Sequence, residues 1–207
     1  PDAVELGRFA VRRALTAHGV AREKDICDHL HIARKQEVQA ALRELQASGE
    51  VAALRLAGDG FPYYALAEAL PGLLKLRAAK PRLQILSPFD NFTIHRDRLV
   101  RLFGFDYTIE CYTPPPKRKY GYFALPLLWG ETLAGRLDAK AERKAGVLDV
   151  RGLWLEDGFK PDDDFLAALA VKLSGFARFN GCAGVRLSAA LPRRFKSALA
   201  RELKQLA

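Results

Sequence analysis

The sequence contains no methionine and only three cysteines among its 207 residues. Cys27, Cys111 and Cys182 lie far apart and form no Cys-x-x-Cys pair, and an odd number of cysteines cannot close a disulfide framework. We expect them to pack as reduced, small hydrophobic residues in a cytoplasmic protein. The longest apolar stretch, residues 123–129, is broken by Pro126 and is far shorter than the roughly 18 residues of a membrane span. The sequence therefore predicts neither a disulfide scaffold nor a membrane protein.

The signature motifs of several enzyme classes are also absent. There is no His-Glu-x-x-His sequence, no paired Cys/His metal spacing, no glycine-rich phosphate loop and no Gly-x-Ser-x-Gly. His29 and His31 are two residues apart at the end of a predicted helix, so they do not share a helical face. The run Asp162–Asp164 is better explained as a helix cap than as a metal cluster. We therefore expect no metal and no cofactor.

Basic residues outnumber acidic residues throughout the chain. The sequence has 33 Lys and Arg against 24 Asp and Glu, a formal net charge of +9. The excess is +2 over residues 1–80, +3 over residues 81–160 and +4 over residues 161–207, with no acidic tail. Hydrophobic residues make up 49% and charged residues 28%, as in ordinary soluble globular domains. Such a balance attracts polyanions such as nucleic acid or acidic membrane surfaces, although a merely basic protein has it too.

The first eighty residues predict a winged helix-turn-helix domain. Apolar residues recur with helical spacing in three stretches: residues 4–17, residues 22–30 and a third helix that ends at Gly49. Two β-like runs follow, residues 51–57 and 61–66, and Asp59-Gly60 between them favours a tight hairpin with positive φ. Three helices followed by a hairpin form the winged variant of the helix-turn-helix, which we assign to residues 1–80.

The third helix carries the candidate DNA-contacting residues of this domain, because in such modules it enters the major groove. A step of about 100° per residue from the apolar face places Gln36, Gln39 and Arg43 outward. Gln can bond adenine edges, and Arg can bond guanine or phosphate. Arg34 and Lys35 lie in the first turn, where they are positioned for phosphates. Alanines and glutamates share or flank this face, and winged helices also serve as structural spacers and protein-docking modules.

Residues 81–207 predict an antiparallel β-rich domain with helices at its C-terminal end. Strand-like runs separated by short turns indicate an open sheet or a small barrel: residues 83–86, 107–112, 120–128, 132–139 and 147–155. A short helix is expected at about residues 95–102. Asp162–Asp164 cap a following helix, and residues 184–188 suggest one more strand. Pro192 opens a last helix whose basic face meets phosphates, a membrane surface or only solvent. The predicted fold class is α+β.

Two basic segments of this domain are further candidates for contact with DNA. The first places three cations and two aromatic residues after three prolines: Lys117, Arg118, Lys119, Tyr120 and Tyr122. Cations beside aromatics suit contact with phosphates and bases. The second is a predicted hairpin with four cations, two on one strand face and two in the turn: Arg136, Lys140, Arg143 and Lys144. A basic hairpin can probe a groove, whereas the alternative is an edge strand protected by its charges.

Five short sequences lie in order along the middle of the chain. They are Ser87–Asn91 (SPFDN), Leu102–Tyr107 (LFGFDY), Lys117–Tyr122 (KRKYGY), Leu125–Gly130 (LPLLWG) and the Arg136–Gly146 segment. Together they resemble the YcaQ/AlkZ family of bacterial winged-helix DNA glycosylases, which are tied to the repair of alkylated and interstrand-crosslinked DNA. The spaced match covers about residues 83–155, and the winged-helix region in front of it fits the same family. The resemblance implies tandem winged helices, then a C-terminal β-rich domain, with a Gln-x-Gln or Gln-x-Asp catalytic motif well before this region.

The catalytic motif that the resemblance implies is absent. The glutamines are Gln36, Gln39, Gln46, Gln84 and Gln205, and none has Gln or Asp two positions later. We therefore assign no catalytic residue to this chain, which alone we expect to be inactive. The missing methionine and the start at Pro1 predict the C-terminal, DNA-binding part of a longer glycosylase. Its expected partners are double-stranded DNA and the missing N-terminal half of the same protein, with no membrane contact, and we expect a cytoplasmic monomer.

Other functions stay open at the level of sequence. One is a non-catalytic winged-helix transcriptional regulator whose β domain senses a ligand or dimerises. Another is a protein-docking module, and a third is a shortened homologue that binds DNA without cutting it. Self-association with binding to palindromic operators would indicate the regulator. A Gln-x-Gln or Gln-x-Asp motif encoded upstream of Pro1 would indicate the glycosylase.

Overall fold

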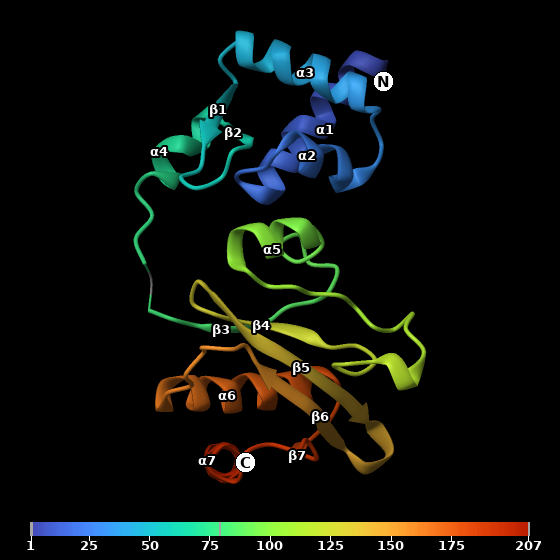
Figure 1. Cartoon of the computed structure of the whole chain (residues 1–207), viewed down its shortest axis with the longest axis vertical. Coiled ribbons are helices and arrows are strands. Elements are labelled where there is room, and N and C mark those ends of the chain that lie inside the picture. Colours follow the sequence, from blue (N-terminus) through green and yellow to red (C-terminus); the bar gives the residue numbers. More distant parts are fainter. Residues whose placement is uncertain (1, 79, 207) are drawn as a thin grey trace. The chain divides into compact units, whose positions relative to one another are not determined.

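The computed structural model describes residues 2–78 and 80–206, and the chain divides into two units, residues 1–78 and residues 79–207. The first unit holds helices and a small two-stranded sheet, and the second holds a larger sheet flanked by helices (Figure 1). Each unit has its own hydrophobic core. Among the described residues, no helix has the length and apolar character needed to cross a membrane.

The first unit contains the three helices and the hairpin that the sequence predicts. Its elements are α1 (Ala3–His18), α2 (Glu23–Leu30), α3 (Lys35–Ala47), β1 (Val51–Arg55), β2 (Pro62–Leu66), the 3-10 turn η1 (Ala67–Ala69) and the short α4 (Leu70–Leu73). β1 and β2 pair antiparallel along their whole length. The turn differs from the prediction, because Gly58 (φ 81°) and not Gly60 adopts the positive φ. Asp59 instead accepts a hydrogen bond from the backbone N–H of Phe61 (3.1 Å).

The core of the first unit lies where α1, α2 and α3 meet β1. Apolar residues recur along α1 at helical spacing, which gives it one buried face: Ala10, Val11, Ala14 and Leu15. That face packs against buried side chains of the other elements: Ile26, Val38, Leu42, Leu45 and Val51. A Cβ at Gly7 would lie 2.7 Å from the carbonyl oxygen of Glu37, so glycine there allows α1 and α3 to approach closely.

The second unit is built on a five-stranded sheet in the order β3-β4-β5-β6-β7. Its strands are β3 (Leu83–Ile85), β4 (Leu125–Trp129), β5 (Thr132–Glu142), β6 (Val147–Leu155) and β7 (Gly184–Leu187). Its helices and 3-10 turns are α5 (Arg96–Phe103), η2 (Pro115–Lys117), η3 (Arg143–Ala145), α6 (Asp163–Phe179) and α7 (Arg193–Gln205). The first four strands pair antiparallel, and the α+β class is confirmed. β7 departs from the prediction and runs parallel to β6, because α6 crosses between them and returns the chain in the same direction.

One predicted strand, residues 107–112, does not form, and another, residues 120–128, was predicted to begin too early. Residues 107–112 form no strand, because the buried Tyr107 hydroxyl instead donates a hydrogen bond to the carbonyl of Ala124 (2.7 Å). The strand predicted over residues 120–128 begins only at Leu125. Before it, the carboxylate of Glu110 accepts the backbone N–H of Tyr120 (2.6 Å), which holds the chain in a loop. In these stretches the loop buries Tyr107, whereas Tyr112 and Tyr122 are exposed.

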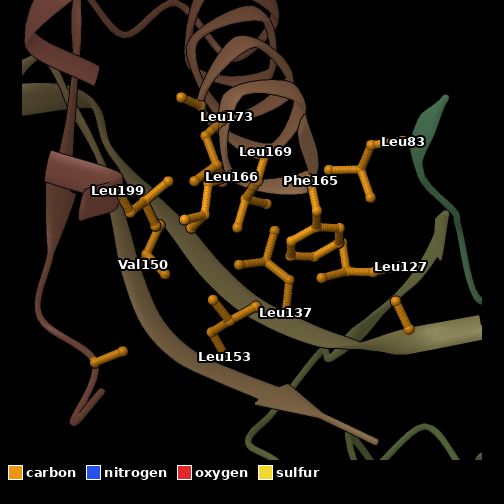
Figure 2. Close-up of a cluster of buried hydrophobic side chains, with 13 residues drawn as sticks. Leu83, Leu127, Leu137, Val150, Leu153, Phe165, Leu166, Leu169, Leu173 and Leu199 are labelled. Atoms are coloured by element: carbon orange, nitrogen blue, oxygen red, sulfur yellow. The ribbon is translucent and has the colours of Figure 1, made fainter. Parts of the chain in front are cut away.

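α6 covers one face of this sheet and supplies much of the core. Asp162 caps it as predicted, since its Oδ1 accepts the backbone N–H of Phe165 (2.8 Å). Figure 2 shows four α6 side chains that point toward four side chains of the sheet: Phe165, Leu166, Leu169 and Leu173, and Leu127, Leu137, Val150 and Leu153. Leu199 of α7 completes this cluster. Burial of each such side chain contributes about 1.5–3 kcal/mol before entropy is counted.

α5 packs on the opposite face of the sheet (Figure 1). The cluster there joins α5, the loop after it and β5: Leu99, Phe105, Tyr107 and Leu133. The register between β4 and β5 shifts in a β-bulge, so that Leu127 pairs with Gly135 and Leu128 with Leu133. The intervening Ala134 lies in the core under α6, whereas Leu133 and Arg136 lie on the α5 side.

Candidate nucleic-acid interface

The predicted residues of α3 divide into an exposed set and a set engaged with α2. Gln39 is half-buried and donates a hydrogen bond to Oε1 of Glu23 (2.8 Å), and the Lys35 ammonium lies 3.8 Å from the same oxygen. Lys35 is itself exposed, as are Arg34, Gln36 and Arg43. In the described part of the chain, neither arginine takes part in an ion pair. Gln39 is therefore already occupied by an intramolecular bond, while the other four predicted residues are exposed.

The segment from Lys117 to Tyr122 is an ordered loop whose backbone is held by one carboxylate. Glu110 accepts the backbone N–H groups of Lys119 (2.8 Å) and Tyr120 (2.6 Å). The turn η2, with two prolines in it, precedes them and fixes φ at those positions. Arg118 donates its Nε–H to the carbonyl of Thr113 (2.8 Å), and its guanidinium lies 5.0 Å from the ring centre of Tyr122. Lys117 and Lys119 remain exposed.

Arg136 is buried, which corrects its prediction as a DNA-contacting residue. Its residue exposure is 2%, and its guanidinium lies between two aromatic rings, 4.5 Å from the centre of Phe105 and 4.1 Å from that of Tyr120. It donates hydrogen bonds to Oε1 of Glu156 (2.8 Å) and to the carbonyl of Asp106 (3.1 Å). The sequence pattern predicted that this face of β5 is exposed, but the loop containing Phe105 and Tyr120 covers it. Arg136 therefore supports this loop from beneath and has no surface for a phosphate.

The tip of the β5–β6 hairpin exposes the remaining predicted cations. Lys140 is exposed at the end of β5, with its ammonium 3.6 Å from Oε1 of Glu142, a carboxylate that also pairs with Arg151 (2.6 Å). Arg143 and Lys144 form the 3-10 turn η3 and are exposed. Within the described residues, these two have no ion-pair partner. The hairpin thus presents two unpaired cations at its tip, which matches the predicted position of both.

Exposed aromatic residues lie in or beside the Lys117–Tyr122 loop, and two of them, Phe89 and Tyr112, were not predicted as site residues. Tyr112 is 88% exposed, Phe89 60% and Tyr122 56%, which is unusual for side chains of this size. Phe89 lies 6.4 Å from the ring of Phe123, between ring centres. Tyr112 adjoins Thr113, whose carbonyl holds Arg118. No sequence signal marked Tyr112 as exposed, because it lies in the run of residues 107–112 that was predicted to be a strand.

Titratable groups near this loop are shifted mainly by burial. Burial raises the pKa of Tyr107 to about 12, against the opposing effect of the nearby Arg96 and Arg136. Burial also raises the pKa of Asp138, whose carboxylate accepts backbone hydrogen bonds from Tyr122 and Phe123. Over the described ranges, no group of three or more His, Cys, Asp and Glu residues is arranged to hold a metal ion. The candidate interface is therefore a cationic and aromatic surface.

Comparison with known proteins identifies the family to which this chain is related. The model of the family described as DNA glycosylase AlkZ-like matches residues 2–179. Among solved structures, the Streptomyces sahachiroi DNA glycosylase AlkZ has a similar fold, with a TM-score of 0.59 and 17% sequence identity over 90% of this chain. The matched region makes up 47% of the length of that glycosylase. Because the family model spans most of both units, this chain belongs to the AlkZ-like DNA glycosylase family.

Proposed function

We propose that this chain is the duplex-binding part of a DNA glycosylase that acts on alkylated or crosslinked DNA. The observation that carries the proposal is the family match over residues 2–179, since a DNA glycosylase family implies a DNA substrate. The chain supplies what a phosphate backbone requires, namely a net charge of +9 and unpaired cations on ordered loops. These contacts position the protein on DNA without reading its sequence.

The first unit acts in this proposal as a winged helix. The order of α1, α2 and α3 followed by the β1–β2 hairpin supports this assignment. α3 then lies in or beside the major groove with Arg34, Gln36 and Arg43 toward DNA. With Gln39 bonded to Glu23, one amide remains for base contact, so we expect little sequence preference. That is the behaviour required of an enzyme whose target is a lesion.

Catalysis in this proposal depends on groups outside these 207 residues. The reaction is attack of water on the N-glycosidic bond, which needs a carboxylate or amide to position the water. None of the five glutamines begins a Gln-x-Gln or Gln-x-Asp sequence, and the matched region is 47% of the related glycosylase. We expect the purified chain to release no alkylated base from DNA. Robust base release in a glycosylase assay would place the catalytic residues within this chain and overturn this part of the proposal.

Charge reversal on the Lys117–Tyr122 loop tests the DNA contact. We expect the chain to bind duplex DNA weakly, with a Kd of roughly micromolar or weaker and a strong dependence on salt. Replacing Lys117, Arg118 and Lys119 by Glu should weaken binding more than replacing Arg193 and Arg194 by Glu on the first turn of α7. The loop is ordered before binding, so its cations lose less freedom on contact with phosphate. Fluorescence anisotropy at several salt concentrations measures both the affinity and the salt slope.

A second variant separates charge from loop structure. The Lys117→Glu/Lys119→Glu variant keeps the bond from Arg118 to Thr113 and the backbone bonds to Glu110, and it removes the contact of Lys119 with the Tyr120 ring. Each lost phosphate contact should reduce the log–log salt slope by about 0.9. An unchanged affinity and slope in this folded variant would remove the loop from the DNA-binding surface. The hairpin tip with Arg143 and Lys144 would then be the next segment to test.

A further inference from the structure

A cavity of about 490 Å³ lies in the second unit between the end of α6, the edge strand β7 and α7. Only Ser174, Ala177 and Arg178 of its lining residues precede residue 179, where the family match ends. The other lining residues belong to the β7–α7 segment or to the turn before it. Neither the family match nor the proposed contact with DNA accounts for this cavity.

The cavity walls are mainly apolar. β7 contributes Val185 and Leu187, while α7 contributes Ala200 and Leu203, and Ala177 closes the wall from α6. Cavities of about 300–1,000 Å³ with apolar walls and a few placed polar groups are typical of small-molecule sites. A duplex phosphate backbone, which is polar and stiff, does not fit such a space. The walls therefore favour a small molecule with an apolar body.

The charged residues that line the cavity are all cations: Arg178, Arg186, Lys196 and Lys204. Two of them already have partners, since Arg186 pairs with Asp149 (3.1 Å) and Lys196 donates to the carbonyl of Ala189 (3.2 Å). Arg178 and Lys204 are exposed and, in the described part of the chain, have no ion-pair partner. No acidic residue lines the cavity to neutralise them. The two free cations therefore define where the acidic group of a ligand would lie.

We propose that this cavity binds a small amphipathic anion, with its apolar body between β7 and α7 and its single acidic group on Arg178 and Lys204. Carboxylates and phosphate monoesters share this chemistry, and charge-assisted hydrogen bonds to two cations suit either. The site is separate from the DNA contacts of the Lys117–Tyr122 loop. Its occupancy does not depend on the proposed function, because no residue of that loop lines the cavity.

Calorimetric titration of the whole chain with two probes of equal chain length tests the proposal. Decanoate carries the acidic group, whereas nonyltrimethylammonium carries the opposite charge on the same nine-carbon apolar tail. We expect saturable binding of decanoate at one site and binding of the cation at least about tenfold weaker, as for the loss of one charge-assisted contact. Decyl phosphate in a third titration distinguishes a phosphate from a carboxylate preference. Equal binding of anion and cation, or no saturable binding of any anion, would overturn the proposal.

Substitutions in the cavity test whether decanoate binds there. Arg178→Glu/Lys204→Glu should weaken decanoate binding about tenfold or more. The matched control, Arg193→Glu/Arg194→Glu, makes the same change of charge on α7 outside the cavity and should leave binding unchanged. Ala200→Phe fills the cavity and should abolish binding while the fold, checked by circular dichroism, is retained. If Ala200→Phe does not fold, the two charge variants still decide, because equal binding by both would place the anion elsewhere.

Discussion

The guanidinium of Arg136 lies 4.1 Å from the ring centre of Tyr120, so a buried cation on β5 supports the loop that exposes Lys117 and Lys119. Arg136 also bonds Glu156 and the carbonyl of Asp106. The exposed cations Lys117 and Lys119 are consequently held in position by Arg136, a cation that is itself buried. This arrangement separates the residues that hold the surface in place from those proposed to touch DNA, and the two sets give different outcomes on substitution.

Replacing Arg136 by Met should lower the free energy of unfolding by about 1–3 kcal/mol, because the carbonyl of Asp106 and the Glu156 carboxylate lose their donor. Duplex binding should also weaken, since Tyr120 loses the group on which it packs. Urea unfolding followed by circular dichroism measures the stability. Lys140→Met is the control, because Lys140 is exposed on the same strand and its loss should change stability by less than about 0.5 kcal/mol. Equal stability of the two variants would contradict a supporting role for Arg136.

Whether Glu110→Ala raises or lowers the affinity for duplex DNA shows which role this residue has. Loss of a negative charge near DNA would by itself tighten binding. We expect binding to weaken about threefold to tenfold instead, because the backbone of Lys119 and Tyr120 loses its two hydrogen bonds to the carboxylate. Glu131→Ala, an exposed acid in the β4–β5 turn, should leave affinity unchanged or raise it. Anisotropy titrations in which both variants bind more tightly than the parent chain would show that Glu110 does not position the loop.

Gly152→Ala should destabilise the second unit by about 1–3 kcal/mol, as expected for overpacking. A Cβ at this position would overlap the ring of Trp154, which packs edge-to-face on Tyr120 with 5.5 Å between ring centres. Gly175→Ala in α6 is a control of opposite sign, since no atom lies within 4 Å of its Cβ and alanine favours helix by about 0.5–1 kcal/mol. Thermal unfolding of both variants measures the difference. Stabilisation by Gly152→Ala would show that the Trp154 ring moves without cost.

The carboxyl group of Asp149 makes the free energy of unfolding depend on pH between about pH 4 and pH 2. The hydrogen bond from Arg186 (3.1 Å) and that from Ser188 (2.6 Å) lower its pKa from 3.8 to about 2. Because the pKa in the folded state lies below the unfolded value, ionised Asp149 stabilises the fold above about pH 4, and this contribution is lost as the pH falls toward 2. Asp149→Asn should lower stability at neutral pH and flatten the loss between pH 4 and 2.

Asp157→Asn provides the control for that experiment, because it makes the same change of side chain at an exposed position. Urea unfolding at several pH values measures the free energies. The difference between the parent chain and Asp149→Asn should shrink steadily as the pH falls. A constant difference from pH 7 to pH 2 would mean that Asp149 is not stabilised in its ionised form.

The helices were predictable because their signals are local. Ala10 and Ala14 recur at helical spacing in α1, and Asp162 stands one residue before α6, where a side-chain cap is needed. The positions of the hairpin tip and of the Lys117–Lys119 cations were likewise visible, since charged runs beside prolines and turn residues stay at the surface. Local patterns therefore located the elements and the exposed charges.

The failures came from contacts between residues far apart in the sequence. Arg136 was predicted to lie on an exposed strand face. The residues around it do not indicate that Tyr120, 16 residues earlier in the sequence, packs its ring on the Arg136 guanidinium. Gln39 was expected to face DNA, but its partner Glu23 lies on another helix, 16 residues away. The bulge at Ala134 also changes which β5 side chains face α5, and no local residue pattern marked it. Pairings of this kind follow only from the folded arrangement.

The parallel pairing of β7 with β6 has a consequence for the order in which the second unit assembles. The antiparallel strands β4, β5 and β6 follow one another through short turns, so their contacts are local and form early. β7 can join them only after α6 has crossed the sheet, which requires closure of a loop of some thirty residues from Leu155 to Gly184. During synthesis, one edge of β6 therefore stays open until residues 184–187 have emerged. Until then, this edge can pair with a strand of a neighbouring chain.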